Sequence, residues 1–224
     1  VMVIGFVNAG MMSLYQATAT IMGANIGTTV TTILLAFGMA NIGKYFMVFA
    51  FIGIFISMLV SNGKAKSWAL TMAGFGLVFF GLTVISACSN TLKENTAIQE
   101  LLRTEIRPAF FEPVVLLLIG AIITAVIQSS TAVNAILLSM VAAGIQIGSG
   151  GNAILYIVLG TNIGTCVTAL ISSMGASTNA KRAALIHFLF NFIGSVIFLV
   201  ILSIWSGFMA DFWQKIIPSA EMQL

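Results

Sequence analysis

Long apolar runs separated by short polar segments dominate this sequence. Three of the runs, residues 45–63, 67–88 and 182–205, are rich in Phe, Ile, Leu and Val and contain few polar interruptions. A helix needs about 20 apolar residues, each rising 1.5 Å, to cross a bilayer. The pattern therefore predicts a membrane-spanning helix in each of the three runs.

Two further apolar stretches, residues 1–43 and 113–180, are interrupted by glycines and polar residues. The interruptions fall at residues 8–10, 23–29, 128–131, 148–152 and 160–165. The pieces between them are too short to cross a bilayer as straight helices. Irregular backbone at membrane depth is tolerated only where protein or a water-filled cavity surrounds it. We therefore expect broken or re-entrant helices whose breaks line a site.

The composition agrees with a membrane protein. Charged residues make up 7% of the 224 residues, 59% are hydrophobic, and the mean hydropathy is +1.10. An ordinary soluble domain has about 25% charged residues. A net charge of +3 provides no basic patch for nucleic acid. Seven charges gather between residues 89 and 112, which predicts a solvated amphipathic loop with surface charges: Lys93, Glu94, Glu100, Arg103, Glu105, Arg107 and Glu112.

An internal repeat organises the chain. Residues 23–31 (GANIGTTVT) and 160–168 (GTNIGTCVT) are identical at seven of nine positions, and the same offset of 137 residues carries Lys44 onto Lys181. Paired broken segments in corresponding halves point to the binding site of a secondary transporter. We therefore expect a first repeat at residues 1–88, an inter-repeat loop at 89–112 and a second repeat at 113–224.

The repeat also predicts what the chain would lack. The partner of Gln128-Ser129-Ser130 would lie upstream of Val1, and the span at 67–88 should recur near the C-terminus, where charges and Pro218 stand instead. We expect the first repeat to be truncated at its start and the second at its end.

Four segments resemble the type II sodium–phosphate cotransporter family, including its bacterial members: GANIGTTVTT, QSSTAVNAI, GTNIGTCVTA and KRAALIHFLFN. The resemblance covers nearly the whole chain. It implies two inverted repeats, each with a Gln-Ser-Ser and a Gly-x-Asn-Ile-Gly-Thr motif, an outward-facing central loop and a bacterial inner membrane. This chain has one Gln-Ser-Ser, and Thr131 replaces the third serine.

Inorganic phosphate would have to be recognised here without a protein cation, because the proposed membrane core contains no Lys or Arg. Helix N-termini, hydroxyls and amides are the remaining donors. Co-bound Na⁺, held by hard oxygen ligands, would supply the missing positive charge. Thr28, Thr29 and Thr165 are expected to begin half-helices. The candidate phosphate residues are Gln128, Ser129, Ser130, Thr131, Asn25, Thr28, Thr29, Asn162 and Thr165. The candidate Na⁺ ligands are Gln128, Ser130, Asn25, Asn162, Thr161 and Thr165.

The predicted fold class is an all-α membrane protein with multispanning helices and two inverted repeats. The predicted function is Na⁺-coupled symport of inorganic phosphate by alternating access, without an organic cofactor and compatible with a homodimer in the lipid bilayer. The alternatives are a channel lined by the same polar breaks and a transporter of another oxyanion. The glycine breaks could also serve packing alone, and His187 suits a packing role better than a proton relay. No acid–base pair, activated nucleophile or metal cluster suggests an enzyme.

Overall fold

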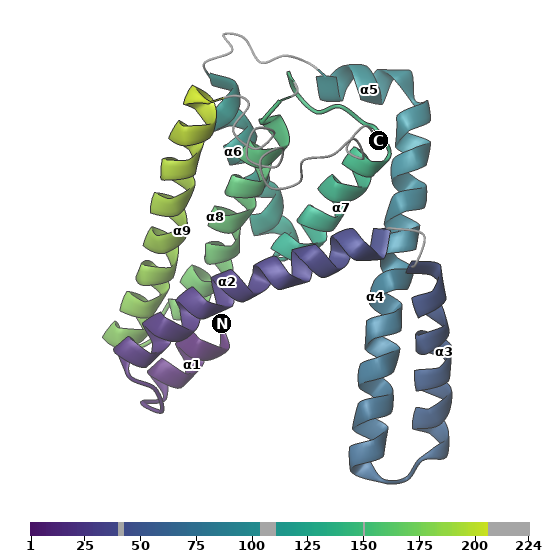
Figure 1. The fold of residues 1–224 in the computed structure, drawn as a ribbon. Coiled ribbons are helices and arrows are strands. Elements are labelled where there is room, and N and C mark those ends of the chain that lie inside the picture. Colours follow the sequence, from purple (N-terminus) through teal and green to yellow (C-terminus); the bar gives the residue numbers. More distant parts are fainter. Residues whose placement is uncertain (40–42, 104–110, 150, 206–224) are drawn as a thin grey trace. The chain divides into compact units, whose positions relative to one another are not determined.

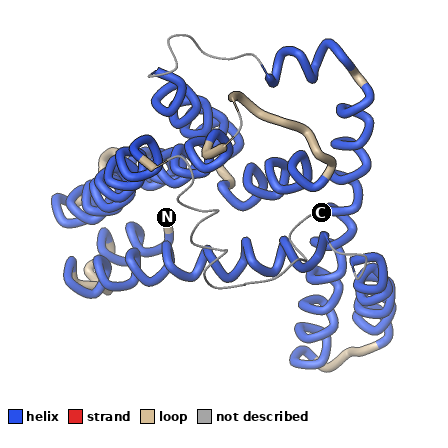
Figure 2. The backbone as a smooth tube through the Cα atoms, turned by 45° about the horizontal axis from the view of Figure 1, so that its top comes forward, coloured by secondary structure: helices blue, strands red, loops and turns tan. Residues whose placement is uncertain are grey.

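The computed structural model describes residues 1–39, 43–103, 111–149 and 151–205, and every regular element in them is an α-helix (Figures 1 and 2). The chain is therefore all-α over its described part, as predicted. The helices are α1 (Met2–Asn8), α2 (Leu14–Met39), α3 (Gly43–Leu59), α4 (Gly63–Glu94), α5 (Thr96–Arg103), α6 (Glu112–Ile127), α7 (Ser130–Ala142), α8 (Ala153–Ser173) and α9 (Thr178–Ile204).

Four of these helices, α2, α4, α8 and α9, are long and apolar enough to cross a membrane. The predicted spans at 67–88 and 182–205 correspond to α4 and α9, although α9 ends at Ile204. The run at 45–63 forms a shorter helix than predicted. Helix α3 ends at Leu59, because Asn62 accepts a hydrogen bond from the Lys64 N–H at 3.0 Å and so caps α4 instead. Together these helices indicate a multi-pass integral membrane protein.

Three of the five predicted breaks are found, and two are wrong. Non-helical backbone separates helices at residues 9–13, 128–129 and, apart from residue 150, which lies outside the described residues, 143–152. By contrast, 23–29 and 160–165 lie inside the continuous helices α2 and α8. The polar side chains there support the helix rather than interrupt it. Asn25 Nδ2 donates to the Ile21 carbonyl oxygen at 3.0 Å, and Thr165 Oγ1 donates to that of Thr161 at 2.8 Å. Thr28, Thr29 and Thr165 therefore begin no half-helix.

The segment between the repeats is more helical than the predicted loop. Helix α4 continues to Glu94, and α5 follows it. The side chains of Leu101 and Phe111 are exposed. The prediction of a surface charge is wrong for Glu112, because its side chain is only 4% exposed and accepts a hydrogen bond from the Ser149 N–H at 2.7 Å. Glu105 and Arg107 lie outside the described residues.

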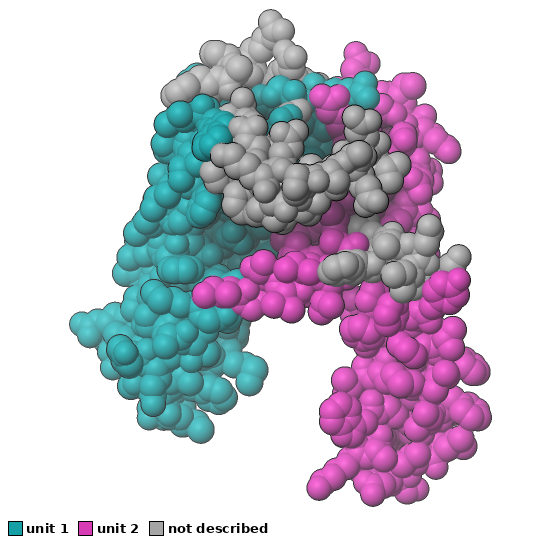
Figure 3. All heavy atoms as spheres, viewed as in Figure 1, with its two compact units in different colours: residues 1–25, 102–133, 147–224 teal, residues 26–101, 134–146 magenta. Residues whose placement is uncertain are grey.

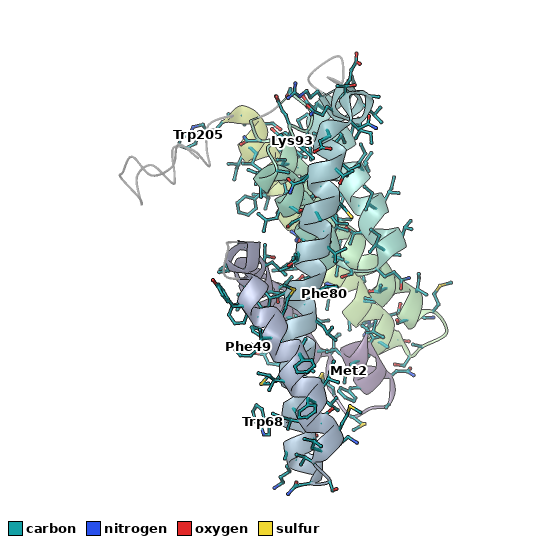
Figure 4. All side chains as sticks on the ribbon, turned by 90° about the vertical axis from the view of Figure 1, so that its right-hand side faces the viewer. Met2, Phe49, Trp68, Phe80, Lys93 and Trp205 are labelled. Atoms are coloured by element: carbon teal, nitrogen blue, oxygen red, sulfur yellow. The ribbon has the colours of Figure 1, made fainter. Side chains whose placement is uncertain are left out.

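The chain divides into two compact units (Figure 3), one comprising residues 1–25, 102–133 and 147–224 and the other residues 26–101 and 134–146. In the second unit, α3 and α4 form a closely packed pair. Gly53 lets the two backbones approach closely, because a Cβ atom at this position would lie 2.5 Å from the Ala73 nitrogen. Trp68 and Phe80 point away from α4 (Figure 4) and are exposed, as lipid-facing side chains would be.

The first unit is built around α8. Helix α6 lies along one side of α8, and α9 packs on another (Figure 1). Polar side chains join α8 to α9: Ser195 Oγ donates to the Leu159 carbonyl oxygen at 3.0 Å, and Asn152 Nδ2 donates to that of Leu202 at 2.8 Å. Hydrogen bonds of this kind commonly hold membrane helices together. The predicted site residues of the second repeat all belong to this unit.

Candidate functional site

The break between α6 and α7 has an unusual backbone conformation. Gln128 ends α6 with φ 58° and ψ 25°, which is left-handed, and its N–H donates to the Thr124 carbonyl oxygen at 2.7 Å. Among the described residues it is the only non-glycine with a positive φ. This conformation costs an L-residue roughly 1–2 kcal/mol. Such strain persists where the surroundings enforce it, and it concentrates at functional sites.

The first turn of α7 presents unpaired donors. Ser129 caps this turn, because its Oγ accepts from the Ala132 N–H at 3.2 Å and its carbonyl oxygen from the Val133 N–H at 3.2 Å. The N–H groups of Ser130 and Thr131, the first two of the helix, have no acceptor within it. Ser129 uses its oxygen as an acceptor and therefore keeps its hydroxyl proton for another partner. This helix end favours an anion.

The last turn of α6 presents the opposite chemistry. The carbonyl oxygen of Thr124 is bonded by Gln128, whereas those of residues 125–127 accept no backbone hydrogen bond from the described residues. Open carbonyl oxygens and the negative end of the helix dipole favour a cation. Only Gln128 and Ser129 separate the two helix ends along the chain. A cation and an anion could therefore bind next to one another at this break.

Helix α8 contributes the second motif, and its glycines have a packing role. A Cβ atom on Gly160 would collide with the carbonyl oxygen of Leu117 in α6, and one on Gly164 would lie 2.5 Å from that of Ala121. The packing interpretation of these glycines is thus correct for α8. The two helices run parallel here, since position 117 meets 160 and position 124 meets 164.

The polar residues of the α8 motif differ in how they use their hydrogen-bonding groups. Thr161 Oγ1 donates to the Val158 carbonyl oxygen and Thr165 Oγ1 to that of Thr161, both at 2.8 Å. Each hydroxyl proton is thereby used, and the Thr165 oxygen keeps its lone pairs. The Asn162 side chain is exposed and has no hydrogen bond within the described residues. Threonine hydroxyls in this state suit a cation better than a phosphate oxygen.

The predicted site residues are distributed between the units. The first unit contains the candidates of the second repeat together with Asn25, whereas Thr28 and Thr29 belong to the second unit. Asn25 uses its amide donor on the Ile21 carbonyl oxygen, which leaves its own Oδ1 as an acceptor.

His187 and the two cysteines are not among the predicted site residues. The Cys166 thiol lies 3.6 Å from the His187 carbonyl oxygen, where α8 packs on α9, and His187 is half-buried. The contact involves the His187 backbone, so a packing role of its side chain stays a prediction. Cys166 and Cys88 are both free thiols.

Sequence reasoning missed Thr124 on the last full turn of α6. Its side chain is fully buried, and its hydroxyl is the one buried side-chain oxygen of the described residues without a hydrogen-bond partner. A threonine one turn before a glutamine at the end of an apolar run was the available signal. This signal is weak, because Thr124 lies within an apolar segment that is typical of an ordinary membrane helix.

Known proteins with similar sequences identify the family of this chain. The model of the Na⁺/Pi-cotransporter family matches residues 1–87 and 90–210. YqeW of Bacillus subtilis, an uncharacterized protein, is 31% identical over 208 residues, which cover 93% of this chain and 64% of YqeW. The Escherichia coli K12 protein named "Putative inorganic phosphate export protein YjbB" is 25% identical over 198 residues, 88% of this chain and 35% of YjbB.

The chain thus spans less than two thirds of the length of these relatives. No solved structure matches it. The family match, by contrast, extends over both copies of the motif and the polar break at Gln128. This chain belongs to the Na⁺/Pi-cotransporter family.

Proposed function

We propose that the protein is a secondary transporter that carries inorganic phosphate across the membrane together with Na⁺. The observation that carries this proposal is the left-handed break at Gln128, where the open carbonyl end of α6 meets the open N–H end of α7. Family membership and the name of the YjbB relative support phosphate as the substrate.

Phosphate would bind at the start of α7. The N–H groups of Ser130 and Thr131, the side chains of Gln128 and Ser130, and the hydroxyl proton of Ser129 are the available donors. A helix N-terminus gives the anion a favourable field without a Lys or Arg. Neutral donors also release the phosphate readily, because the charge-assisted bonds to a cationic side chain are about twice as strong.

Na⁺ would bind to oxygens whose protons are already engaged. Thr165 and Asn25 each give a proton to a carbonyl oxygen of their own helix and keep an oxygen available. Thr161, whose hydroxyl also donates within α8, belongs to the same proposed set. Asn162, Gln128 and Ser130 complete the proposed set. An anion at membrane depth is costly without a counter-charge, and a cation is costly without an anion. Each ion therefore helps the other to bind, which is the physical basis of obligatory coupling.

The proposed cycle is alternating access around this break, in a bacterial inner membrane. The second copy of the motif in α2 would supply Asn25, Thr28 and Thr29 to the same transport pathway. A channel lined by these residues remains the rival, because it could use the same polar groups without coupling. The two differ in whether flux saturates and whether it follows the Na⁺ gradient.

Uptake of radiolabelled phosphate into proteoliposomes that contain the full-length protein tests this proposal. An inward Na⁺ gradient should drive saturable uptake, and replacement of Na⁺ by choline at fixed pH should stop it. Reversing the gradient should release preloaded phosphate, which also measures the export direction named for YjbB. Equal transport under a proton gradient in choline, or a linear flux independent of any gradient, would contradict coupling to Na⁺.

A further inference from the structure

The hydroxyl of Thr124 is exceptional among the helical threonines of this chain. Seven threonines in the described helices donate to the carbonyl oxygen four residues earlier, among them Thr83, which donates to Phe79 at 3.0 Å. Thr124 is fully buried and makes no such bond. An unpaired buried hydroxyl costs about 1–3 kcal/mol. This cost calls for a partner that the protein chain itself does not provide.

The surroundings of Thr124 favour a positive ion as that partner. Thr124 lies one turn before Gln128, at the negative end of α6, and the open carbonyl oxygens of residues 125–127 follow it directly. A hydroxyl, backbone carbonyls and a helix C-terminus form the oxygen set that binds Na⁺ in membrane transporters. The same helix end repels an anion, so phosphate is the less suitable ligand here.

Contact with α8 closes this position. Gly164 lies directly against Thr124, since a Cβ atom on Gly164 would be 2.7 Å from the Thr124 Cβ. The neighbouring Thr165 belongs to the proposed Na⁺ set, and its hydroxyl proton is already donated to Thr161. An ion bound beside Thr124 would therefore be shielded from water by α8 and would lie close to the second motif.

From these observations we infer that Thr124 is a further Na⁺ ligand, in a dehydrated cation site where α6 meets α8. The hydroxyl oxygen of Thr124 has no hydrogen-bond partner within the described residues, so its lone pairs can face the ion. This inference rests on the proposed Na⁺-coupled transport and extends it by one ligand.

The test compares Thr124→Val with Thr124→Ser in the purified full-length protein in detergent. The melting temperature is recorded in increasing NaCl against choline chloride at equal ionic strength, without phosphate. Valine has nearly the shape of threonine but lacks the oxygen, so removal of an unpaired buried group should raise the melting temperature in choline. The same variant should need about tenfold more Na⁺ for its half-maximal stabilisation, the equivalent of one lost ligand worth about 1.4 kcal/mol.

Thr124→Ser keeps the oxygen and should retain the Na⁺ response of the natural protein. Thr83→Val is the matched control, because that hydroxyl is already bonded to its own helix; its Na⁺ response should not change. If Thr124→Val responds to Na⁺ as the natural protein does, Thr124 is not a ligand, although Na⁺ coupling itself still stands. If the natural protein shows no Na⁺ effect on either melting or uptake, the proposed function fails, and this inference fails with it.

Discussion

Helices α2 and α8 carry almost the same nine-residue motif in very different surroundings. In α8, Gly160 and Gly164 lie so close to α6 that a Cβ atom on either would collide with its backbone or side chains. In α2, no described atom lies within 4 Å of the Cβ positions of Gly23 and Gly27. The glycine spacing therefore permits close helix packing without determining it.

What the two copies share must then have a reason besides this packing. Each contains an Asn, an Ile and a Thr at the same spacing, and the Asn lies on the surface or only partly buried in both. In α8 the motif threonines donate to their own helix, and in α2 the Asn25 amide does the same. The same spacing of polar side chains in different packing environments is what a shared role in ion binding predicts.

The largest expected effect tests the difference in glycine packing between α8 and α2. Gly160→Ala places a methyl group against the Leu117 carbonyl oxygen and should lower the free energy of unfolding by about 3 kcal/mol, at the upper end of overpacking costs. Gly23→Ala adds the same methyl group where nothing opposes it, and should be neutral or stabilising by up to about 1 kcal/mol through helix propensity. Unfolding in SDS–detergent mixtures measures both. Equal destabilisation by the two changes would show that α2 is packed as closely as α8.

A smaller effect tests the shared chemistry. Asn25→Ala and Asn162→Ala should each reduce Na⁺-driven phosphate uptake by about tenfold, the loss expected for one ion-binding group. Neither change should alter the amount of folded protein, because neither side chain is fully buried. Uptake per folded protein in proteoliposomes is the measurement. If only Asn162→Ala impairs uptake, the α2 copy has no part in transport.

The smallest difference concerns the position at which the motifs diverge. Cys166 is completely buried between α8 and α9, while its counterpart Thr29 is exposed. Cys166→Ala should cost about 1 kcal/mol in the free energy of unfolding through lost contacts. Thr29→Ala should change it by less than about 0.5 kcal/mol, as surface changes usually do. A larger effect at Thr29 would show a packing partner for α2.

The sequence predicted the polar break at Gln128 but not the continuity of α2 and α8. Gln128-Ser129-Ser130 interrupts an apolar run, and the chain does break there. Glycine and asparagine at 23–29 and 160–165 predict the same interruption, yet the Asn25 side chain bonds to its own helix, and Gly160 and Gly164 admit α6. Local composition cannot distinguish a glycine that ends a helix from one that accommodates another helix.

Two buried polar residues, Glu112 and Thr124, show a second limit of prediction from the sequence. The charged segment before Glu112 predicts a surface charge there, but Glu112 starts α6 and accepts a hydrogen bond from the Ser149 N–H. An acid directly before a proline and an apolar run is a helix-start signal that could have revealed its position. The burial of Thr124 depends on the approach of Gly164 from a helix 40 residues further on. No pattern among neighbouring residues in the sequence predicts such a contact.

The most direct test of the central claim, that phosphate binds at the start of α7, is Na⁺-driven uptake by Ser130→Ala. Ser130 begins α7 and its side chain makes no hydrogen bond within the described residues, so its loss should leave the fold intact. Ser172→Ala is the control, since that hydroxyl only donates to the Thr168 carbonyl oxygen of its own helix. The account predicts that Ser130→Ala lowers uptake by about tenfold or more, while Ser172→Ala transports as the natural protein does. Uptake by Ser130→Ala at the natural rate and phosphate affinity would contradict it.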